Sequence, residues 1–228
     1  MMPERQLAAV LFDLDGTLID SAPDLLYALD QILARLDLPR SNHEILRHHA
    51  SRGAAGILEA GLPVGHDFDS DDLKRDFLQI YAENLWRQTR PFADIDELLD
   101  VLVAKDIKLG IVTNKISRFA DPVLRHADWE QRFGCMITGD RVTAPKPDPE
   151  PVLAACQALC VSPRETLFIG DDRRDVEAGR AAGTLTAVAE WGYIEPGCDP
   201  ATWRADLSLA SPLLLMQQFA TKISAAKP

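Results

Sequence analysis

The stretch that decides the fold is "LAAVLFDLDGTLID", residues 7–20. An apolar run fit for a buried strand opens it, and two aspartates, Asp13 and Asp15, follow. A strand repeats its side-chain direction every second residue, so extended geometry would place both carboxylates close together. Like charges repel in such a place, which favours a site where a cation holds them. A loop that is merely acidic is the plainer alternative.

Composition narrows the class of protein. The chain has 228 residues, 46% of them hydrophobic, which suits one large domain or one domain with an insertion. A net charge of −11 disfavours nucleic acid and anionic membrane surfaces as partners. No apolar run approaches the roughly 20 residues that cross a bilayer, and the start resembles no signal peptide. We expect a cytoplasmic monomer or weak homo-oligomer with buried, reduced cysteines.

Strand-like and helical patterns alternate along most of the chain. Helical patterns separate most of the apolar runs, which lie at residues 8–13, 108–114, 134–138, 166–171 and 185–190. Such alternation predicts an α/β fold with a doubly wound parallel sheet. Residues 21–90 break the pattern, because they are helical throughout. We therefore expect a core of residues 1–16 and 91–228 with a helical insertion, residues 17–90, after the first strand.

Polar side chains follow the predicted strands where each strand ends. Ligands of open α/β sheets bind at this edge. Taken singly, each residue has an ordinary explanation as a turn former, a helix cap or a solvated side chain. The recurrence at one edge argues for a shared site. The candidates are Asp13, Asp15, Thr113, Asn114, Lys115, Lys146, Asp171, Asp172 and Asp175.

Phosphoryl transfer through an aspartate is the chemistry that needs this set. Asp13 would attack phosphorus, because a carboxylate can accept a phosphoryl group covalently. Asp15 would protonate the leaving oxygen and later activate water. A hard divalent cation would lie among the carboxylates. The Thr113 hydroxyl, the Asn114 backbone N–H and Lys146 would hold the other phosphate oxygens.

Four segments resemble, in order, the motifs of the haloacid-dehalogenase superfamily. They are "DLDGT" (13–17), "VTN" (112–114), Lys146 and "GDDRRD" (170–175). The resemblance implies a Rossmann-like core, a helical cap after the first motif, and Mg²⁺ as cofactor. It also implies Asp13 as nucleophile and Asp15 as acid/base, with the metal held by the Asp13 carboxylate, the Asp15 backbone carbonyl and Asp171. Asp172 and Asp175 match supporting acidic positions.

Two groups within the superfamily resemble the chain most. "VTNK", "KPDPEP" and "GDDRRDVEAGRAAG" are similar to phosphoglycolate phosphatases. "WGYIEPGCDPATWRAD" (191–206) and "NKISRFADP" (114–122) are closer to N-acetylmuramic acid 6-phosphate phosphatases. The expected function is a magnesium-dependent phosphatase that hydrolyses a small-molecule phosphate monoester through an aspartyl-phosphate. We expect it to be phosphoglycolate phosphatase-like, with N-acetylmuramic acid 6-phosphate or another sugar phosphate as the alternative substrate.

Substrate choice is expected to depend on groups that close over the rest of the substrate, with candidates in the helical insertion and just after the second motif. Arg52, in "SRGAAG", could pair with a substrate carboxylate, and Lys115 and Arg118 compete for the same role. Four other functions are weighed against this one, and the first three fit less well. A dehalogenase has no use for an acid at Asp15, and a phosphonatase needs a cap lysine where the chain offers Lys74 alone. A non-enzymatic phospho-acceptor would need an aspartate where the second strand ends in Thr113, and it leaves the helical insertion without a purpose. A magnesium-binding scaffold would differ from an enzyme in leaving a generic aryl phosphate intact.

Overall fold

A six-stranded parallel sheet forms the centre of the computed structural model, which describes residues 7–63, 65 and 71–217. Its strand order is β5-β4-β1-β6-β7-β8. The strands are β1 (Ala9–Phe12), β4 (Lys108–Val112), β5 (Cys135–Ile137), β6 (Thr166–Gly170), β7 (Leu185–Ala189) and β8 (Leu207–Leu209). The chain passes first to one side of β1 and then to the other. The carboxyl end of β1 therefore lies at the switch point where such sheets bind ligands.

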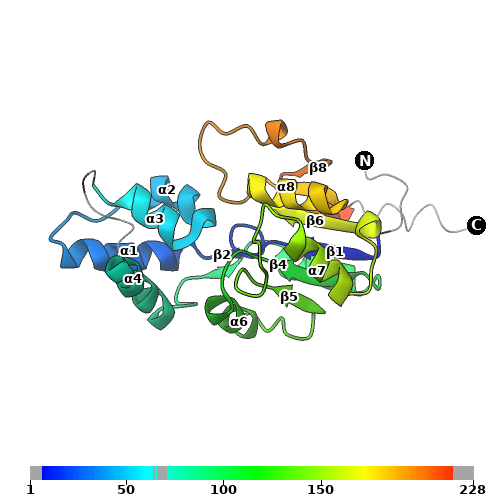
Figure 1. Ribbon diagram of the computed structural model, residues 1–228, viewed down its shortest axis with the longest axis horizontal. Helices are drawn as coiled ribbons and strands as arrows, with labels where there is room; N and C mark the ends of the chain where they lie inside the picture. The colour runs from blue at the N-terminus through cyan, green and yellow to red at the C-terminus, as the bar shows by residue number, and fades with distance from the viewer. Residues whose placement is uncertain (1–6, 64, 66–70, 218–228) are drawn as a thin grey trace, which may run out of the picture.

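Helices cover both faces of the sheet (Figure 1). They are α5 (Ile95–Val103), α6 (Ser117–His126), α7 (Glu150–Ala158) and α8 (Arg173–Ala182). Successive residues of β1 point to opposite faces: Val10 and Phe12 pack with the apolar side of α5, whereas Ala9 and Leu11 pack with that of α7. Burial on both faces explains why β1 reads as an unbroken apolar run. The predicted doubly wound α/β fold is confirmed.

Some local predictions were wrong at their edges. The three-residue strand β8 was not predicted, because "LSL" is too short to give a pattern. The helix predicted over 148–160 begins and ends inside that range, at Glu150 and Ala158. Cys160 consequently lies past the helix end and is exposed, as is Cys198, whereas Cys156 is buried. The expectation that all four thiols are buried therefore fails for Cys160 and Cys198.

A second, helical region lies beside the sheet at one end of the molecule (Figure 1). Its elements are α1 (Ala22–Arg35), α2 (His43–Leu46), the 3-10 helix η1 (Arg47–Arg52), α3 (Gly53–Gly61) and α4 (Asp71–Glu83). The predicted apolar stripes of α1 and α4 meet in one core of their own, with Leu29, Phe77 and Ile80 among its buried members. Across the described residues, no helix combines the length and the apolar character needed to cross a membrane.

Two short strands join the helical region to the sheet. β2 (Ile19–Asp20) leads into α1, and β3 (Arg90–Pro91) leads back, and the two pair antiparallel. Buried Asp24 of α1 strengthens the junction: it accepts hydrogen bonds from the Gln88 and Thr89 amides at 2.8 and 3.1 Å and from the Thr89 hydroxyl at 2.6 Å. The two chain crossings therefore lie side by side.

Candidate active site

The polar residues at the strand ends gather around one cavity of about 290 Å³. The cavity lies at the carboxyl ends of β1 and β4 and reaches into the helical region. Its polar lining comprises Asp13, Asp15, Ser51, Arg52, Tyr81, Thr113, Asn114, Lys115, Lys146, Asp172, Arg174 and Asp175. Its apolar lining includes Leu25, Leu78, Ile116 and Phe119. Most of the residues singled out from the sequence are therefore brought together.

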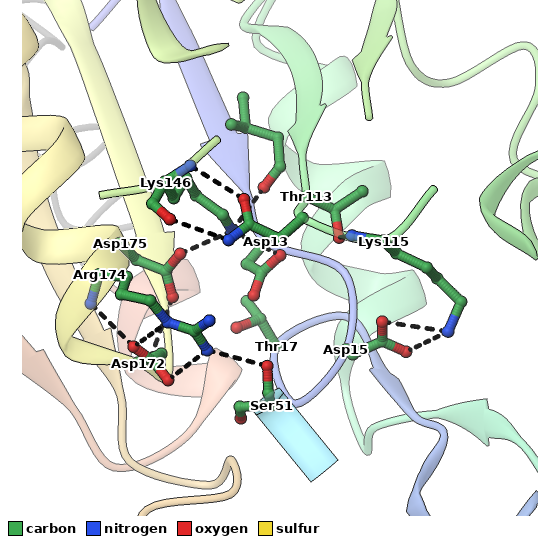
Figure 2. A network of polar contacts seen from close by, with 12 residues as sticks. Asp13, Asp15, Thr17, Ser51, Thr113, Lys115, Lys146, Asp172, Arg174 and Asp175 are labelled. Carbon is green, nitrogen blue, oxygen red and sulfur yellow. Dashed lines mark hydrogen bonds and ion pairs between the residues drawn. The ribbon is translucent and has the colours of Figure 1, made fainter. Parts of the chain in front are cut away.

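Lys146 stands at the deep end of this cavity, between two carboxylates. Its Nζ is 2.8 Å from Asp13 Oδ1 and 2.7 Å from Asp175 Oδ1, and it donates to the Val112 carbonyl at 2.9 Å. Burial lowers the pKa of Lys146, but the Asp13 and Asp175 charges outweigh burial, so the pKa is raised and the cation persists. We call Lys146, Asp13 and Asp175 the Lys146 centre (Figure 2).

Asn114 fixes the backbone of Lys146. The Asn114 amide donates to the Lys146 carbonyl at 2.9 Å and accepts from the Lys146 N–H at 3.0 Å. The Thr113 hydroxyl lies at the neighbouring strand end and accepts from the Lys115 amide at 3.1 Å. The segment after β4 and the loop that carries Lys146 are thereby locked together, which sets the ammonium beside Asp13.

Asp15 belongs to a different cluster, because β1 ends at Phe12 and the chain turns before Asp15. Lys115 Nζ contacts Asp15 Oδ1 at 2.9 Å and Oδ2 at 3.1 Å, and donates to the Tyr81 hydroxyl at 2.8 Å. Ser21 Oγ also donates to Asp15. We call Lys115, Asp15 and Tyr81 the Lys115 centre. Figure 2 shows Asp15 turned toward Lys115, whereas Asp13 is turned toward Lys146.

Asp171 is the third carboxylate of this group and is buried behind the residues that line the cavity, without being one of them. Thr17 Oγ1 donates to it at 3.1 Å, and Ser51 Oγ and the Tyr193 amide donate at 2.9 Å each. Burial raises the pKa of Asp171 well above its usual range, and the nearby charges of Asp13 and Asp175 raise it further. The site is tight: a Cβ on Gly16 would lie 2.1 Å from an Asp171 oxygen.

These carboxylates fit a hard divalent cation. One oxygen each of Asp13, Asp171 and Asp175 lies within 4.8 Å of the others. Asp13 Oδ1 and Asp175 Oδ1 are buried without a well-formed hydrogen bond, although Lys146 is at ion-pair distance. Asp13 and Asp175 share the one Lys146 ammonium, Asp171 lies beside them, and oxygen ligands suit Mg²⁺. Asp175 therefore lies as close to the possible cation position as Asp13 and Asp171, the two carboxylate ligands expected from the sequence.

Asp172 begins α8 rather than facing a metal. It accepts the Arg174 N–H in a capping box with Asp175. The Arg174 guanidinium holds both Asp172 oxygens, at 2.9 and 2.8 Å, and also donates to the Ser51 carbonyl at 2.9 Å. Asp172 therefore positions a guanidinium that bridges to the helical region.

The three cations expected to recognise substrate differ in position. Lys115 and Arg52 line the cavity, but Arg52 is half-exposed and paired with Glu59. Arg118 is absent from the lining: it reaches Gln79 at 3.4 Å, and its guanidinium carbon lies 5.4 Å from the centre of the Phe119 ring. Lys115 is thus the one of the three that is both buried and at the cavity.

Sequence reasoning missed three polar residues of the site. Tyr81 was interpreted as part of the apolar stripe of α4, which its position supports, yet its hydroxyl reaches Lys115. Ser51 and Arg174 were not singled out, although each adjoins a residue that was. The only signal for Arg174 was its place inside "GDDRRD".

Comparison with known proteins agrees with this geometry. The haloacid dehalogenase-like hydrolase family matches residues 10–189. An N-acetylmuramic acid 6-phosphate phosphatase of Pseudomonas aeruginosa is 40% identical over 212 residues, covering 92% of this chain and 94% of that one. A phosphoglycolate phosphatase of Xanthomonas campestris is 36% identical over 204 residues, which cover 90% of this chain and 92% of that protein.

Solved structures agree as well. The crystal structure of a predicted phosphoglycolate phosphatase from Haemophilus somnus superposes with a TM-score of 0.82 at 26% identity, covering 95% of this chain and all of that one. The match spans the sheet and the helical region alike. The chain therefore belongs to the haloacid dehalogenase-like hydrolase family and is a phosphoric monoester hydrolase.

Proposed function

We propose that the enzyme transfers the phosphoryl group of a small-molecule ester to Asp13 and then to water, with Mg²⁺ as cofactor. The observation that carries the proposal is the Lys146 centre, which sets a buried carboxylate and a permanent cation 2.8 Å apart at the cavity floor. Asp13 attacks phosphorus, the bond to the leaving oxygen breaks, and an aspartyl-phosphate forms. Lys146 stabilises the negative charge on the transferring group.

Asp15 completes the reaction in this proposal. It gives a proton to the leaving oxygen as the first bond breaks, and takes a proton from the water that attacks the aspartyl-phosphate. Asp13 and Asp171 would hold the cation, with the Asp15 backbone carbonyl, and Asp175 would support Lys146. Mg²⁺, when bound, neutralises phosphate charge and orients the ester for in-line attack.

For the substrate, we propose N-acetylmuramic acid 6-phosphate, with 2-phosphoglycolate as the second candidate. Two relatives of 40% and 38% identity bear the first name, and relatives of 36% and 37% identity bear the second. The cavity adds support, since its apolar wall of Leu25, Leu78 and Phe119 offers a sugar derivative contacts that a short glycolate chain cannot use. Both candidates carry a carboxylate.

Phosphate release from a panel of esters tests the proposal. The panel contains both candidates, N-acetylglucosamine 6-phosphate and p-nitrophenyl phosphate, each assayed with excess chelator and then with added Mg²⁺ or Ca²⁺. We expect activity to vanish with chelator, return with Mg²⁺ and return poorly with Ca²⁺, whose looser coordination misplaces the reacting groups. Full turnover in excess chelator, or no turnover of any ester, contradicts the proposal.

A further inference from the structure

All three N–H donors of the Lys115 ammonium are already engaged. Its side chain is 8% exposed, and its three donors are taken by Asp15 Oδ1, Asp15 Oδ2 and the Tyr81 hydroxyl. Burial lowers the pKa of Lys115, but Asp15 and Tyr81 outweigh burial and raise it, so the group remains a cation. A new anion can reach this cation only if Asp15 yields one of its contacts.

Asp15 is equally committed. Lys115 contacts both of its oxygens and Ser21 Oγ donates to Oδ1. The acid/base of the proposed reaction is thus held on Lys115, and its oxygens must be released to serve the leaving group. If a substrate anion took the place of Asp15 on Lys115, the anion would gain a cation and Asp15 would regain a free oxygen.

The other cations that line the cavity are tied to the core, bridge from α8 to the Ser51 carbonyl of the helical region, or lie at the rim. Lys146 is held within the core by Asp13 and Asp175. Arg174 is fixed by both oxygens of Asp172, and Arg52 is half-exposed. Lys115 is the buried cation whose partners come from both the strand end and α4, so it faces the space that a substrate enters.

Tyr81 supplies a second donor at the same point. Its hydroxyl oxygen accepts from Lys115 at 2.8 Å, and the described residues offer no acceptor for its own proton. Burial raises the pKa of Tyr81 to about 12, so the phenol keeps that proton. An ammonium and a hydroxyl this close together match the two oxygens of a carboxylate.

We propose that Lys115 binds the carboxylate of the substrate in exchange for a contact with Asp15, so that recognition of the carboxylate frees the acid/base. The inference rests on the proposed phosphatase function and assigns its substrate class, phosphate esters that carry a carboxylate. The cation keeps one carboxylate partner, and the released Asp15 takes up a proton from water, so the buried charge stays balanced. That proton is the one that Asp15 then gives to the leaving oxygen. With an ester that lacks a carboxylate, Asp15 stays paired with Lys115. We therefore expect such an ester to have a lower kcat as well as a higher KM.

A matched pair of substrates tests the exchange. N-acetylmuramic acid 6-phosphate and N-acetylglucosamine 6-phosphate share ring and phosphate, and only the first bears a carboxylate. For Lys115→Met we expect kcat/KM on the acidic ester to fall roughly 10- to 100-fold, as for loss of a charged hydrogen bond. The neutral ester should lose far less, so the acid-to-neutral ratio collapses. Lys115→Arg should restore part of the ratio.

The control variant is Lys105→Met, which removes one lysine charge before β4, at the opposite edge of the sheet. It should leave both rates unchanged. The same ratio is measured with 2-phosphoglycolate and p-nitrophenyl phosphate, in case the ring is not accepted. If thermal melting shows Lys115→Met to be unfolded, Tyr81→Phe takes its place, and a selective several-fold loss on the acidic ester is expected.

The outcomes distinguish failure of the Lys115 exchange from failure of the proposed phosphatase function. Equal losses on acidic and neutral esters would mean that Lys115 only orients Asp15, and the exchange is then wrong while the phosphatase stands. A wild-type enzyme that treats both esters alike, or a Lys115→Met variant that loses nothing, also overturns it. Failure of the wild type to hydrolyse any ester removes the proposed function itself.

Discussion

The Lys146 centre and the Lys115 centre are two buried ammonium groups, each holding one aspartate of "DLD". The partners of Lys146, which are Asp13, Asp175 and the Val112 carbonyl, all belong to the sheet and its own helices. Lys115 takes Asp15 from the end of β1 but Tyr81 from α4 in the helical region. One centre is built wholly within the core, whereas the other is complete only when both regions are in place.

In the proposed reaction, this difference suits the two aspartates to separate tasks. Their mutual repulsion is eased by two cations rather than one, because the chain turns after Phe12 and sends Asp13 and Asp15 to different lysines. A core-held nucleophile suits a step common to every phosphate ester. An acid/base held jointly with α4 suits control by the part of the substrate that the helical region contacts.

The harshest test of the comparison is Asp13→Asn. The amide keeps the shape of the side chain but cannot take the phosphoryl group, so we expect kcat to fall by about four to six orders of magnitude on every ester. Phosphate release on the acidic and neutral esters measures this. A variant with near-normal turnover on either ester would remove Asp13 from the nucleophile role.

Lys146→Met should come next. It leaves Asp13 and Asp175 without their common cation, which we expect to cost about 10²- to 10³-fold in kcat. Breaking a buried ion pair also destabilises by about 3–5 kcal/mol, measurable by urea unfolding. Both kinds of ester should suffer alike, in contrast to Lys115→Met. A loss confined to acidic esters would mean that Lys146, like Lys115, serves carboxylate recognition, and the distinction between the two centres would be wrong.

Asp15→Asn should have an effect that depends on the leaving group. With p-nitrophenyl phosphate, whose leaving group needs little protonation, attack continues, and hydrolysis of the aspartyl-phosphate slows by about 10²-fold or more. Rapid acid quenching after labelled substrate should then trap a phosphoenzyme. If good and poor leaving groups are slowed to the same extent and no phosphoenzyme accumulates, Asp15 has another role.

Asp24→Asn is the mildest test. The amide can accept only part of the three hydrogen bonds that hold Gln88 and Thr89, so we expect a loss of about 1–3 kcal/mol in unfolding free energy. If the Lys115 centre depends on the position of α4, selectivity for acidic esters should drop several-fold while neutral turnover stays within about twofold. Urea unfolding and the two rates are measured on the same preparation, and a fall in neutral turnover alone would contradict the expected order.

The sheet and the gathering of polar residues at its edge were predictable from the sequence. Buried strands such as β1 are recognisable in the sequence as apolar runs. Because the strands are parallel, the residue after each run lies at the ligand-binding edge of the sheet. Asp13 and Asp171, which directly follow β1 and β6, lie close together for this reason. The short strands β2, β3 and β8 carry too few residues to show a period.

The partners of the site residues were not predictable, because a pattern does not say how side chains turn. Alternation suggested that Asp13 and Asp15 point the same way, but the strand ends at Phe12 and they diverge. Tyr81 satisfied the helical stripe of α4 so well that its hydroxyl went unnoticed. The position of Arg118 outside the cavity lining likewise depends on how α6 is rotated, which spacing alone does not fix.

The β2–β3 pair has a consequence for how such a molecule can change over evolution. Entry to and exit from the helical region lie on paired strands, Ile19 beside Pro91 and Asp20 beside Arg90. The gap to be bridged is one strand spacing, about 5 Å, whatever the length of the insert. An insert with adjoining ends can be shortened, exchanged or redesigned without moving β1, as in other tolerated domain insertions. New specificities can thus be grafted onto an unchanged catalytic sheet.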